Sequence, residues 1–245
     1  MQHRPWSVPQ RPWVMAQSWQ YLLFMHWRIA PELLRPLLPV GLTLDTYDGA
    51  AWIGVVPFLM NHVRLRGVAP IRHTSRFPEL NVRTYVKYQD KPGVWFFSLD
   101  ADHLPAVITA RLTFNLPYFK AKMMLSVHDD EVLYLSHRHH IGANPADFIA
   151  RYRPTDDVYY SKPGTLDDWL TERYALYAAD RRGGLYRGEI HHLPWSLQLA
   201  DATIDTNTIA AASGIMLPDD PPLLHFVRNI DVLAWSIQRL NKNAP

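Results

Sequence analysis

Residues 79–88 read Glu79-Leu80-Asn81-Val82-Arg83-Thr84-Tyr85-Val86-Lys87-Tyr88 and alternate between polar and apolar side chains. A period of two is typical of a β-strand, in which successive side chains point to opposite faces of the sheet. One face would carry Leu80, Val82, Thr84 and Val86, and the other Glu79, Asn81, Arg83, Tyr85 and Lys87. The second face presents a carboxylate, an amide and a guanidinium in one row. That row faces either water or the interior of a polar pocket.

The rest of the chain predicts a domain built mainly from antiparallel strands around this segment. Residues 89–93 contain Pro and Gly and would turn the strand back onto a second strand over 94–100. Twelve Tyr and nine Trp favour β-structure, and 20 Pro against 11 Gly indicate many chain reversals rather than long helices. Apolar spacing predicts two short helices, over 31–38 and 166–178. We expect residues 1–245 to form a single α+β domain.

Composition excludes several classes of function. The net charge is only +2 and no run rich in Lys or Arg occurs, so nucleic-acid and membrane partners are not expected. Cys is absent, which excludes disulfides, thiolate metal sites and a Cys nucleophile. The first residues lack the basic-then-apolar pattern of a signal peptide. These features predict a cytoplasmic protein.

Common catalytic and metal-binding motifs are missing. The sequence contains no Gly-x-Ser-x-Gly nucleophile motif and no Gly-rich phosphate loop after a strand. Its clustered histidines, His137, His139, His140, His191 and His192, include two adjacent pairs. Adjacent residues of a strand point to opposite faces, so neither pair forms a natural chelate. We therefore predict no metal and no cofactor.

Several segments together resemble the YqjF-like family of uncharacterised bacterial proteins, a domain of unknown function (2071) in the acetoacetate decarboxylase-like superfamily. The segments are Phe24-Met-His-Trp-Arg-Ile-Ala-Pro-Glu32, Leu38-Pro-Val-Gly-Leu42, Asp48-Gly-Ala-Ala-Trp52, Phe77-Pro-Glu-Leu-Asn-Val-Arg-Thr-Tyr-Val86, Phe96-Phe-Ser-Leu-Asp-Ala101, Leu185-Tyr-Arg-Gly-Glu-Ile-His-His192, Pro194-Trp195 and Pro222-Leu-Leu-His-Phe226. The resemblance runs along nearly the whole chain. It implies a mainly β fold, an antiparallel β-barrel or cone around a central cavity with a few short helices, often assembled as a homo-oligomer.

The resemblance also implies a chemistry from which this chain departs. Decarboxylases of the superfamily form a Schiff base between a Lys and a keto acid, in a motif that reads roughly Gly-Arg-Glu, three residues, then Pro-Lys-Lys. Arg111 and Pro117 match this motif, but Tyr118 stands at the Schiff-base Lys position and Phe119 at the next Lys position. Loss of the amine argues against decarboxylation.

Other positions resemble the pocket residues of the superfamily. Arg28 resembles the pocket arginine that precedes a Pro-Glu helix, and Glu79 resembles the pocket carboxylate of a strand. Glu79 would transfer protons, and Arg28 and Arg83 would bind a substrate carboxylate. Asn81 lies on the same strand face as Glu79 and Arg83. The alternative for Glu79, Asn81 and Arg83 is a structural ion pair or a solvated face.

Two further rows carry candidate residues. Tyr118, Lys120 and Lys122 share one strand face, so Lys120 could replace the missing Schiff-base Lys if desolvation lowered its pKa. The alternative is an amphipathic strand with both lysines in water. Arg187, Glu189 and His191 form the second row, where His191 could exchange protons near neutral pH; the alternative is a surface strand.

These residues support three hypotheses of different classes. The first is an enzyme of lyase, hydratase or aldolase type acting on a small keto acid, with Glu79, Tyr118 and Lys120 as catalytic residues and Arg28, Asn81, Arg83 and Arg111 binding the substrate. The second is a non-catalytic protein that binds a small molecule in the same cavity. The third is a structural protein whose cavity is filled by its own side chains.

Overall fold

The computed structural model describes residues 3–68, 76–103 and 114–240, and these residues are mainly β-structure. The strands are β1 (Met15–Ile29), β2 (Thr43–Leu44), β3 (Ala51–Leu65), β4 (Phe77–Tyr88), β5 (Lys91–Ala101), β6 (Tyr118–His128), β7 (Glu131–Arg138), β8 (Ala146–Pro154), β9 (Ala175–Ala179), β10 (Leu185–His191), β11 (Gln198–Asn207), β12 (Leu223–Ala234) and β13 (Gln238–Arg239). The helices are α1 (Pro31–Leu34), η1 (Arg35–Leu37), α3 (Leu166–Thr171) and η2 (Ala211–Ser213). Of the helices described, none has the length and apolar character needed to cross a membrane.

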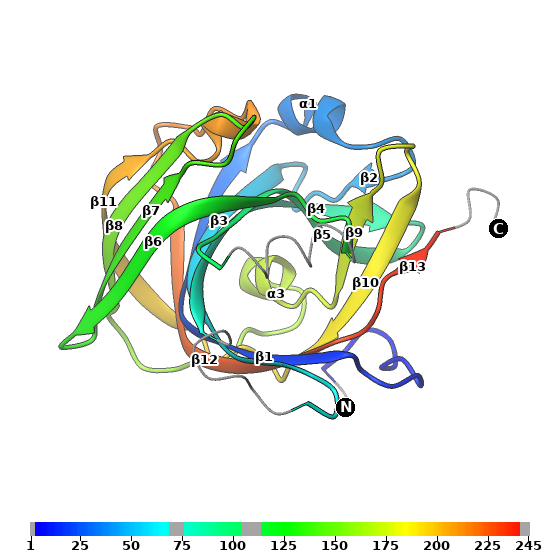
Figure 1. Cartoon of the computed structure of the whole chain (residues 1–245), viewed down its shortest axis with the longest axis horizontal. Helices are drawn as coiled ribbons and strands as arrows, with labels where there is room; N and C mark the ends of the chain where they lie inside the picture. Colours follow the sequence, from blue (N-terminus) through cyan, green and yellow to red (C-terminus); the bar gives the residue numbers. More distant parts are fainter. Residues whose placement is uncertain (1–2, 69–75, 104–113, 241–245) are drawn as a thin grey trace.

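The strands close into two rings that share a wall. One ring runs β5-β6-β7-β8-β11-β12-β1-β3-β4 and returns to β5 through the β4–β5 pairing, which makes a closed barrel of nine strands. Pairings of β5 with β9, β9 with β10 and β10 with β12 close a second, smaller ring on the other side of the shared strands. Figure 1 shows β7, β8 and β11 on the left and β9 and β10 on the right. We call the nine-strand ring the packed ring and the smaller ring the hollow ring.

Alternation along the shared strands sends side chains into both rings. On β1, Leu23 and Met25 enter a core made with residues of β7 and β8, while Leu22 and Phe24 enter a second core on the opposite face. The first core fills the packed ring with large side chains such as Tyr134. The second core lines the hollow ring, which retains a cavity. Strands buried on both faces in this way cannot slip by one residue without exchanging the contents of the two rings.

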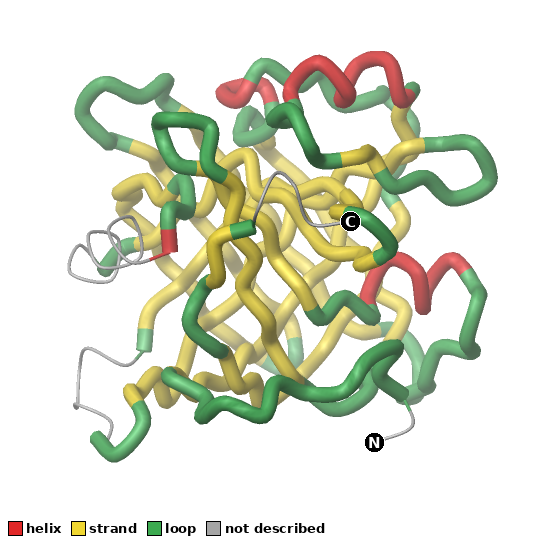
Figure 2. The backbone as a smooth tube through the Cα atoms, turned by 90° about the vertical axis from the view of Figure 1, so that its right-hand side faces the viewer, coloured by secondary structure: helices red, strands yellow, loops and turns green. Residues whose placement is uncertain are grey.

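The structure confirms the predicted fold class, a mainly antiparallel β-barrel with a few short helices. The strand over 79–88 is β4, and it pairs with β5 across the predicted turn. The helix predicted over 31–38 is confirmed as α1 followed by η1. In Figure 2 the short helices lie at the margins of the strand scaffold.

The helix predicted over 166–178 is wrong in its second half. Helix α3 ends at Thr171, and residues from Ala175 onward form β9. Strand β9 hydrogen-bonds to β5 on one side and β10 on the other, so it closes the hollow ring. Two ladders of backbone hydrogen bonds outweigh the local helical spacing, which is a weak preference that tertiary contacts override.

Gly93 permits the close approach of β5 and β9, and this predicts a measurable cost of adding a side chain. A Cβ at Gly93 would lie 2.6 Å from the carbonyl oxygen of Ala175, a backbone atom that cannot move aside cheaply. We expect Gly93→Ala to lower the free energy of unfolding, measured by urea denaturation, by about 1–3 kcal/mol. Gly188→Ala is the control, because its new Cβ would meet only side-chain atoms, those of Leu176 at 3.0 Å and of Ile237 at 3.3 Å. An equal or larger loss in the control would contradict the explanation.

Candidate functional site

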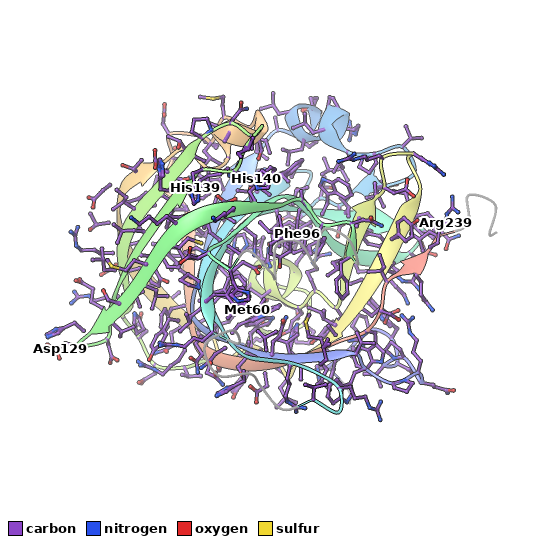
Figure 3. All side chains as sticks on the ribbon, in the orientation of Figure 1. Met60, Phe96, Asp129, His139, His140 and Arg239 are labelled. Carbon is purple, nitrogen blue, oxygen red and sulfur yellow. The ribbon has the colours of Figure 1, made fainter. Side chains whose placement is uncertain are left out.

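The hollow ring encloses a cavity of about 510 Å³. Its wall is largely apolar and includes Trp19, Met60, Phe77, Phe96, Leu99, Leu116, Leu176, Ile190 and Trp195. Figure 3 places Met60 and Phe96 toward the middle of the molecule, whereas Asp129 and Arg239 lie at its periphery. A largely apolar concavity of this size with a few polar groups is the usual form of a small-molecule site.

Polar side chains reach this cavity at separate points of the wall. Glu79 and Arg83 line it from β4, Tyr118 from the start of β6, and Arg173 from the segment after α3. His103 also lines the cavity, where its ring stacks on Phe77 with 5.4 Å between centroids. Two residues of the polar face of 79–88, Glu79 and Arg83, therefore face the interior of a pocket, whereas the side chain of Lys87 at the end of the row is 43% exposed.

Glu79 and Tyr118 form a hydrogen-bonded pair inside the protein. The hydroxyl of Tyr118 donates to Oε2 of Glu79 over 2.8 Å, and the side chains belong to residues that are only 8% and 3% exposed. Burial raises the pKa of Glu79 to about 8, which the Tyr118 bond opposes and the charge of Asp100 reinforces. Burial and the adjacent Glu79 raise the pKa of Tyr118 well above its usual value. At neutral pH the pair therefore holds both protons.

Residues on neighbouring strands hold the Glu79–Tyr118 pair in place. The hydroxyl of Tyr134 donates to the backbone carbonyl of Glu79 over 2.7 Å. Asp100, on the neighbouring strand, is bound by Nε and Nη2 of Arg138, at 2.9 Å and 2.6 Å for the shortest contacts. Asp100 therefore has its own cation, and Glu79 forms no ion pair among the residues described.

A second polar group lies at the other end of β4. The guanidinium of Arg83 packs 5.0 Å from the ring of Phe24 and 5.8 Å from that of Tyr85. Arg173 lies 4.9 Å from the same Tyr85 ring and donates to Asp45 over 2.7 Å. The hydroxyl of Tyr85 is 2.6 Å from Nε2 of His26. Burial and the charge of Arg83 lower the pKa of His26 well below its usual value, so this imidazole is neutral.

The structure brings together only part of the residue set that the sequence suggested. Glu79, Arg83 and Tyr118 line one cavity. Asn81 is buried on the same face of β4 but is absent from the described lining, and its Oδ1 has no hydrogen-bond partner in the described part of the chain. Arg111 lies outside the described residues.

Two expected positions need correction. Arg28 does not reach the cavity, because it lies at the end of β1 beside Trp52 and its side chain is exposed. Lys120 is half-buried and does not line the cavity, and Lys122 is exposed. Strand β6 leaves the hollow ring after Tyr118 and continues into the packed ring, so its later residues are carried away from the site.

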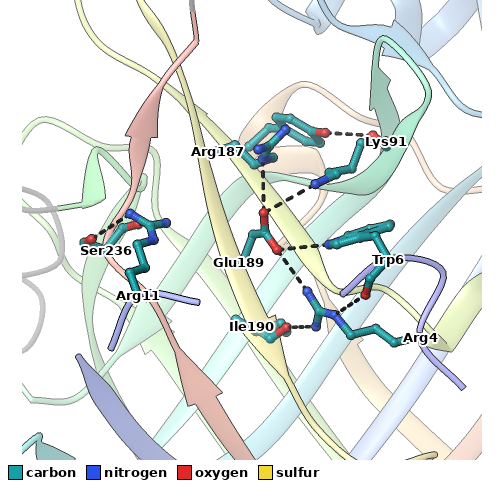
Figure 4. A network of polar contacts seen from close by, with 9 residues as sticks. Arg4, Trp6, Arg11, Lys91, Arg187, Glu189, Ile190 and Ser236 are labelled. Carbon is teal, nitrogen blue, oxygen red and sulfur yellow. Dashed lines mark hydrogen bonds and ion pairs between the residues drawn. The ribbon is translucent and has the colours of Figure 1, made fainter. Parts of the chain in front are cut away.

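The third predicted row lies on β10, where Glu189 is the centre of a polar network (Figure 4) and also borders the cavity. Glu189 accepts from Arg4 over 3.0 Å and from the indole of Trp6 over 2.9 Å, and it also contacts Lys91 and Arg187. We call residues 3–14 the N-terminal strap, because this carboxylate ties them to β10. Glu189 is buried and not on a solvated surface strand, which was the alternative, and its contacts hold the strap in place.

Reasoning from the sequence missed several residues of the cavity wall, among them Arg173 and His103. Arg173 fell within the predicted helix, although it follows the last residue of α3 by two positions. His103 is an isolated histidine with no motif around it. No local signal identifies either residue, because each reaches the cavity through pairings between distant segments. No group of three or more His, Asp or Glu side chains in the described ranges is placed to hold a metal ion.

Solved structures with the same architecture define the class. An acetoacetate decarboxylase from Legionella pneumophila superposes with a TM-score of 0.65 at 15% identity, over 97% of this chain and 91% of that one. The enduracididine biosynthesis enzyme MppR, complexed with a condensation product of pyruvate and imidazole 4-carboxaldehyde, gives a TM-score of 0.67 at 12% identity, over 96% and 92%. The fold is therefore acetoacetate decarboxylase-like.

The family follows from sequence. The model of DUF2071, a family of uncharacterized conserved proteins, matches residues 16–231, and the chain belongs to this family. It is 47% identical over 233 residues to the uncharacterized protein YqjF of Bacillus subtilis (strain 168), which covers 95% of each chain. The resemblance inferred from the sequence segments is confirmed.

The raised pKa of Glu79 predicts a specific pH dependence of stability. The folded state binds the Glu79 proton more tightly than the unfolded state, whose pKa is near 4.5. The stabilisation is therefore complete below about pH 4.5 and is lost as the pH rises through about 8. Glu79→Gln has no carboxyl group at this position and does not show this loss. The free energy of unfolding of the variant minus that of the wild type should therefore rise by a few kcal/mol between about pH 5 and pH 9.

Urea denaturation across that pH range measures this difference. Glu32→Gln is the matched control, because Glu32 is exposed on α1 and its removal should leave the wild-type pH profile unchanged. A difference between Glu79→Gln and wild type that stays constant with pH would contradict the assigned burial effect.

The Glu189 cluster predicts how the strap responds to loss of one charge. In Glu189→Gln the buried guanidinium of Arg4 loses its anionic partner, which costs about 3 kcal/mol when one member of a buried pair is removed. We expect amide hydrogen exchange of residues 3–14 to accelerate strongly, while β1 and β4 keep their protection. Glu131→Gln, at an exposed position of β7, should change neither. Unchanged exchange in the strap would show that Glu189 does not hold it.

Proposed function

We propose that the protein is an enzyme that catalyses proton transfer on a carbonyl compound bearing a carboxylate, without forming a Schiff base. The observation that carries this proposal is the buried Glu79–Tyr118 pair in the wall of the cavity, with the pKa of Glu79 raised to about 8. Strongly perturbed acids in a cleft are frequent at catalytic sites, where the pKa is matched to the working pH.

The pair can act as a proton donor to a carbonyl oxygen. A carboxylic acid kept neutral by an apolar site donates a hydrogen bond that strengthens as negative charge develops on the oxygen. Because Tyr118 donates to Oε2, the acid proton of Glu79 is directed to the other oxygen, Oε1. The same group, once ionised, can remove a proton from the carbon next to a carbonyl.

Lyase, hydratase and aldolase reactions on oxo acids share this enolisation step, so the pair fits all three classes. A neighbour of the same fold, MppR, is described in complex with pyruvate, at a TM-score of 0.62 and 13% identity. That supports a carbonyl acid as the kind of ligand to test first.

A non-catalytic binding protein is the second candidate. It is favoured by the absence of any lysine from the described lining of the cavity, which removes the nucleophile used for imine chemistry. The cavity would then hold its ligand through apolar contacts and the two arginines.

Exchange of carbon-bound protons for deuterium tests the proposal directly. We expect the protein to accelerate exchange beside the carbonyl of at least one oxo acid in a panel from pyruvate to 7-oxooctanoate, followed by proton NMR in D₂O. Glu79→Gln should abolish the acceleration, and Tyr118→Phe should reduce it by about 10²-fold or more. The rate should follow an apparent pKa near 8.

Lys120→Met serves as the control, since Lys120 does not line the cavity and its loss should leave the rate unchanged. Absence of exchange with every acid in the panel, while an acid binds, would reject the enzyme and leave the binding protein. Full activity in Glu79→Gln would show that another group transfers the proton.

A further inference from the structure

The closed end of the cavity carries one positive charge without an acidic partner. Arg83 is 8% exposed, and no carboxylate lies within ion-pair distance of it among the residues described. Its neighbours are the rings of Phe24 and Tyr85, and burial raises the pKa of Tyr85, so the phenol is neutral as well. A buried charge without a partner is costly, and natural proteins nearly always pair it.

The second arginine at this end is only partly satisfied. Asp45 binds Arg173 over 2.7 Å, but it also binds Lys87 over 2.8 Å, so one carboxylate serves two cations. Nη2 of Arg173 and Nε of Arg83 are buried and have no hydrogen-bond partner in the described part of the chain. Both arginines line the cavity. Two guanidinium groups with unused donors are suited to a carboxylate.

This end is well separated from the acid pair. Glu79 and Arg83 are four residues apart on β4, which corresponds to about 13 Å between their Cα atoms. The Arg83 guanidinium packs against the ring of Phe24 on β1 and against that of Tyr85, two residues farther along β4. In a 2-oxo or 3-oxo acid the carbonyl lies one or two bonds from the carboxylate carbon. A separation of this size along the strand favours an acid whose carbonyl lies several bonds farther from its carboxylate.

The space between the two ends is apolar and large. Phe96, Leu99 and Leu176 line it. An apolar protein cavity of about 150 Å³ accommodates one benzene molecule. At about 510 Å³, this cavity holds a ligand several times larger.

We propose that Arg83 and Arg173 form a carboxylate subsite at the closed end of the cavity, and that the ligand is an elongated apolar carboxylic acid. This inference deepens the proposed function by naming its substrate class: the reacting carbonyl is several bonds from the carboxylate. It differs from the small keto acid expected from the sequence in the length of chain between the carboxylate and the carbonyl.

The opposite orientation has its own arginine, which makes the proposal testable. Arg64 lines the cavity from the end of β3, beside Leu65 and Val68, which are 60% and 49% exposed and mark the mouth. A ligand that entered tail first would leave its carboxylate at Arg64. The Arg64 guanidinium lies near solvent, 5.2 Å from the ring of Trp13. The buried charge at the closed end therefore attracts a carboxylate more strongly, which favours binding with the carboxylate at that end.

Calorimetric titration with saturated acids tests the subsite independently of catalysis, since these acids lack a carbonyl. We expect octanoate to bind at least about tenfold more tightly than butyrate, owing to four more buried methylenes. Arg83→Gln should weaken octanoate binding by about tenfold or more, through loss of charge-assisted bonds. Arg64→Gln, the same change at the mouth, should have little effect, and Glu79→Gln should still bind.

Arg173→Gln removes the ion pair with Asp45 and could disturb folding, so the fold of this variant is checked by circular dichroism. Arg83→Gln breaks no ion pair among the described residues and is the decisive variant. Equal affinity for butyrate and octanoate, or loss of binding in Arg64→Gln but not in Arg83→Gln, would overturn the proposal. Arginine-dependent octanoate binding without proton exchange on any oxo acid would reject the proposed enzyme and leave the subsite intact.

Discussion

The structure depends on strands that are buried on both faces. β4 separates the packed ring from the hollow ring, with Leu80 and Val82 in one and Glu79 and Arg83 in the other. A single strand therefore supplies core on one side and site on the other. Because a shift by one residue would bury the charged row in the packed core, the register of β4 is fixed by the cost of burying charge without partners.

Burial of the polar row gives it its chemical character. In water, Glu79 would be an ordinary carboxylate and Arg83 an ordinary cation. Inside the hollow ring, desolvation keeps Glu79 neutral, while Arg83 has no acidic partner among the described residues. The same environment thus leaves a protonated carboxyl group at one point of the strand and a guanidinium without an acidic partner at another. Their separation along β4 is set by strand geometry.

The remaining polar clusters hold the scaffold around this strand. Asp100 and Arg138 form a buried pair near Glu79, and Glu189 fixes the N-terminal strap on β10 (Figure 4). Both carboxylates have cations of their own. Glu79 has none among the described residues, and this contrast distinguishes the site from the structural ion pairs around it.

The sequence by itself determined the alternation of 79–88 and the fold class, and its family resemblance predicts that Tyr118 stands where the decarboxylases have the Schiff-base Lys. These features depend on adjacent residues, or on segments whose similarity to a family survives in the letters of the chain. It could not show which face of 79–88 points to the cavity, since both faces become buried.

Only the tertiary structure decided which residues converge. Arg173 meets Arg83 because β9 pairs with β5, and that long-range pairing also ends the helix that local spacing predicted. Arg28 and Lys120, on strands that continue past the hollow ring, are carried away from it. Periodicity sets the direction of a side chain relative to its own strand, whereas the position of the strand depends on partners distant in sequence.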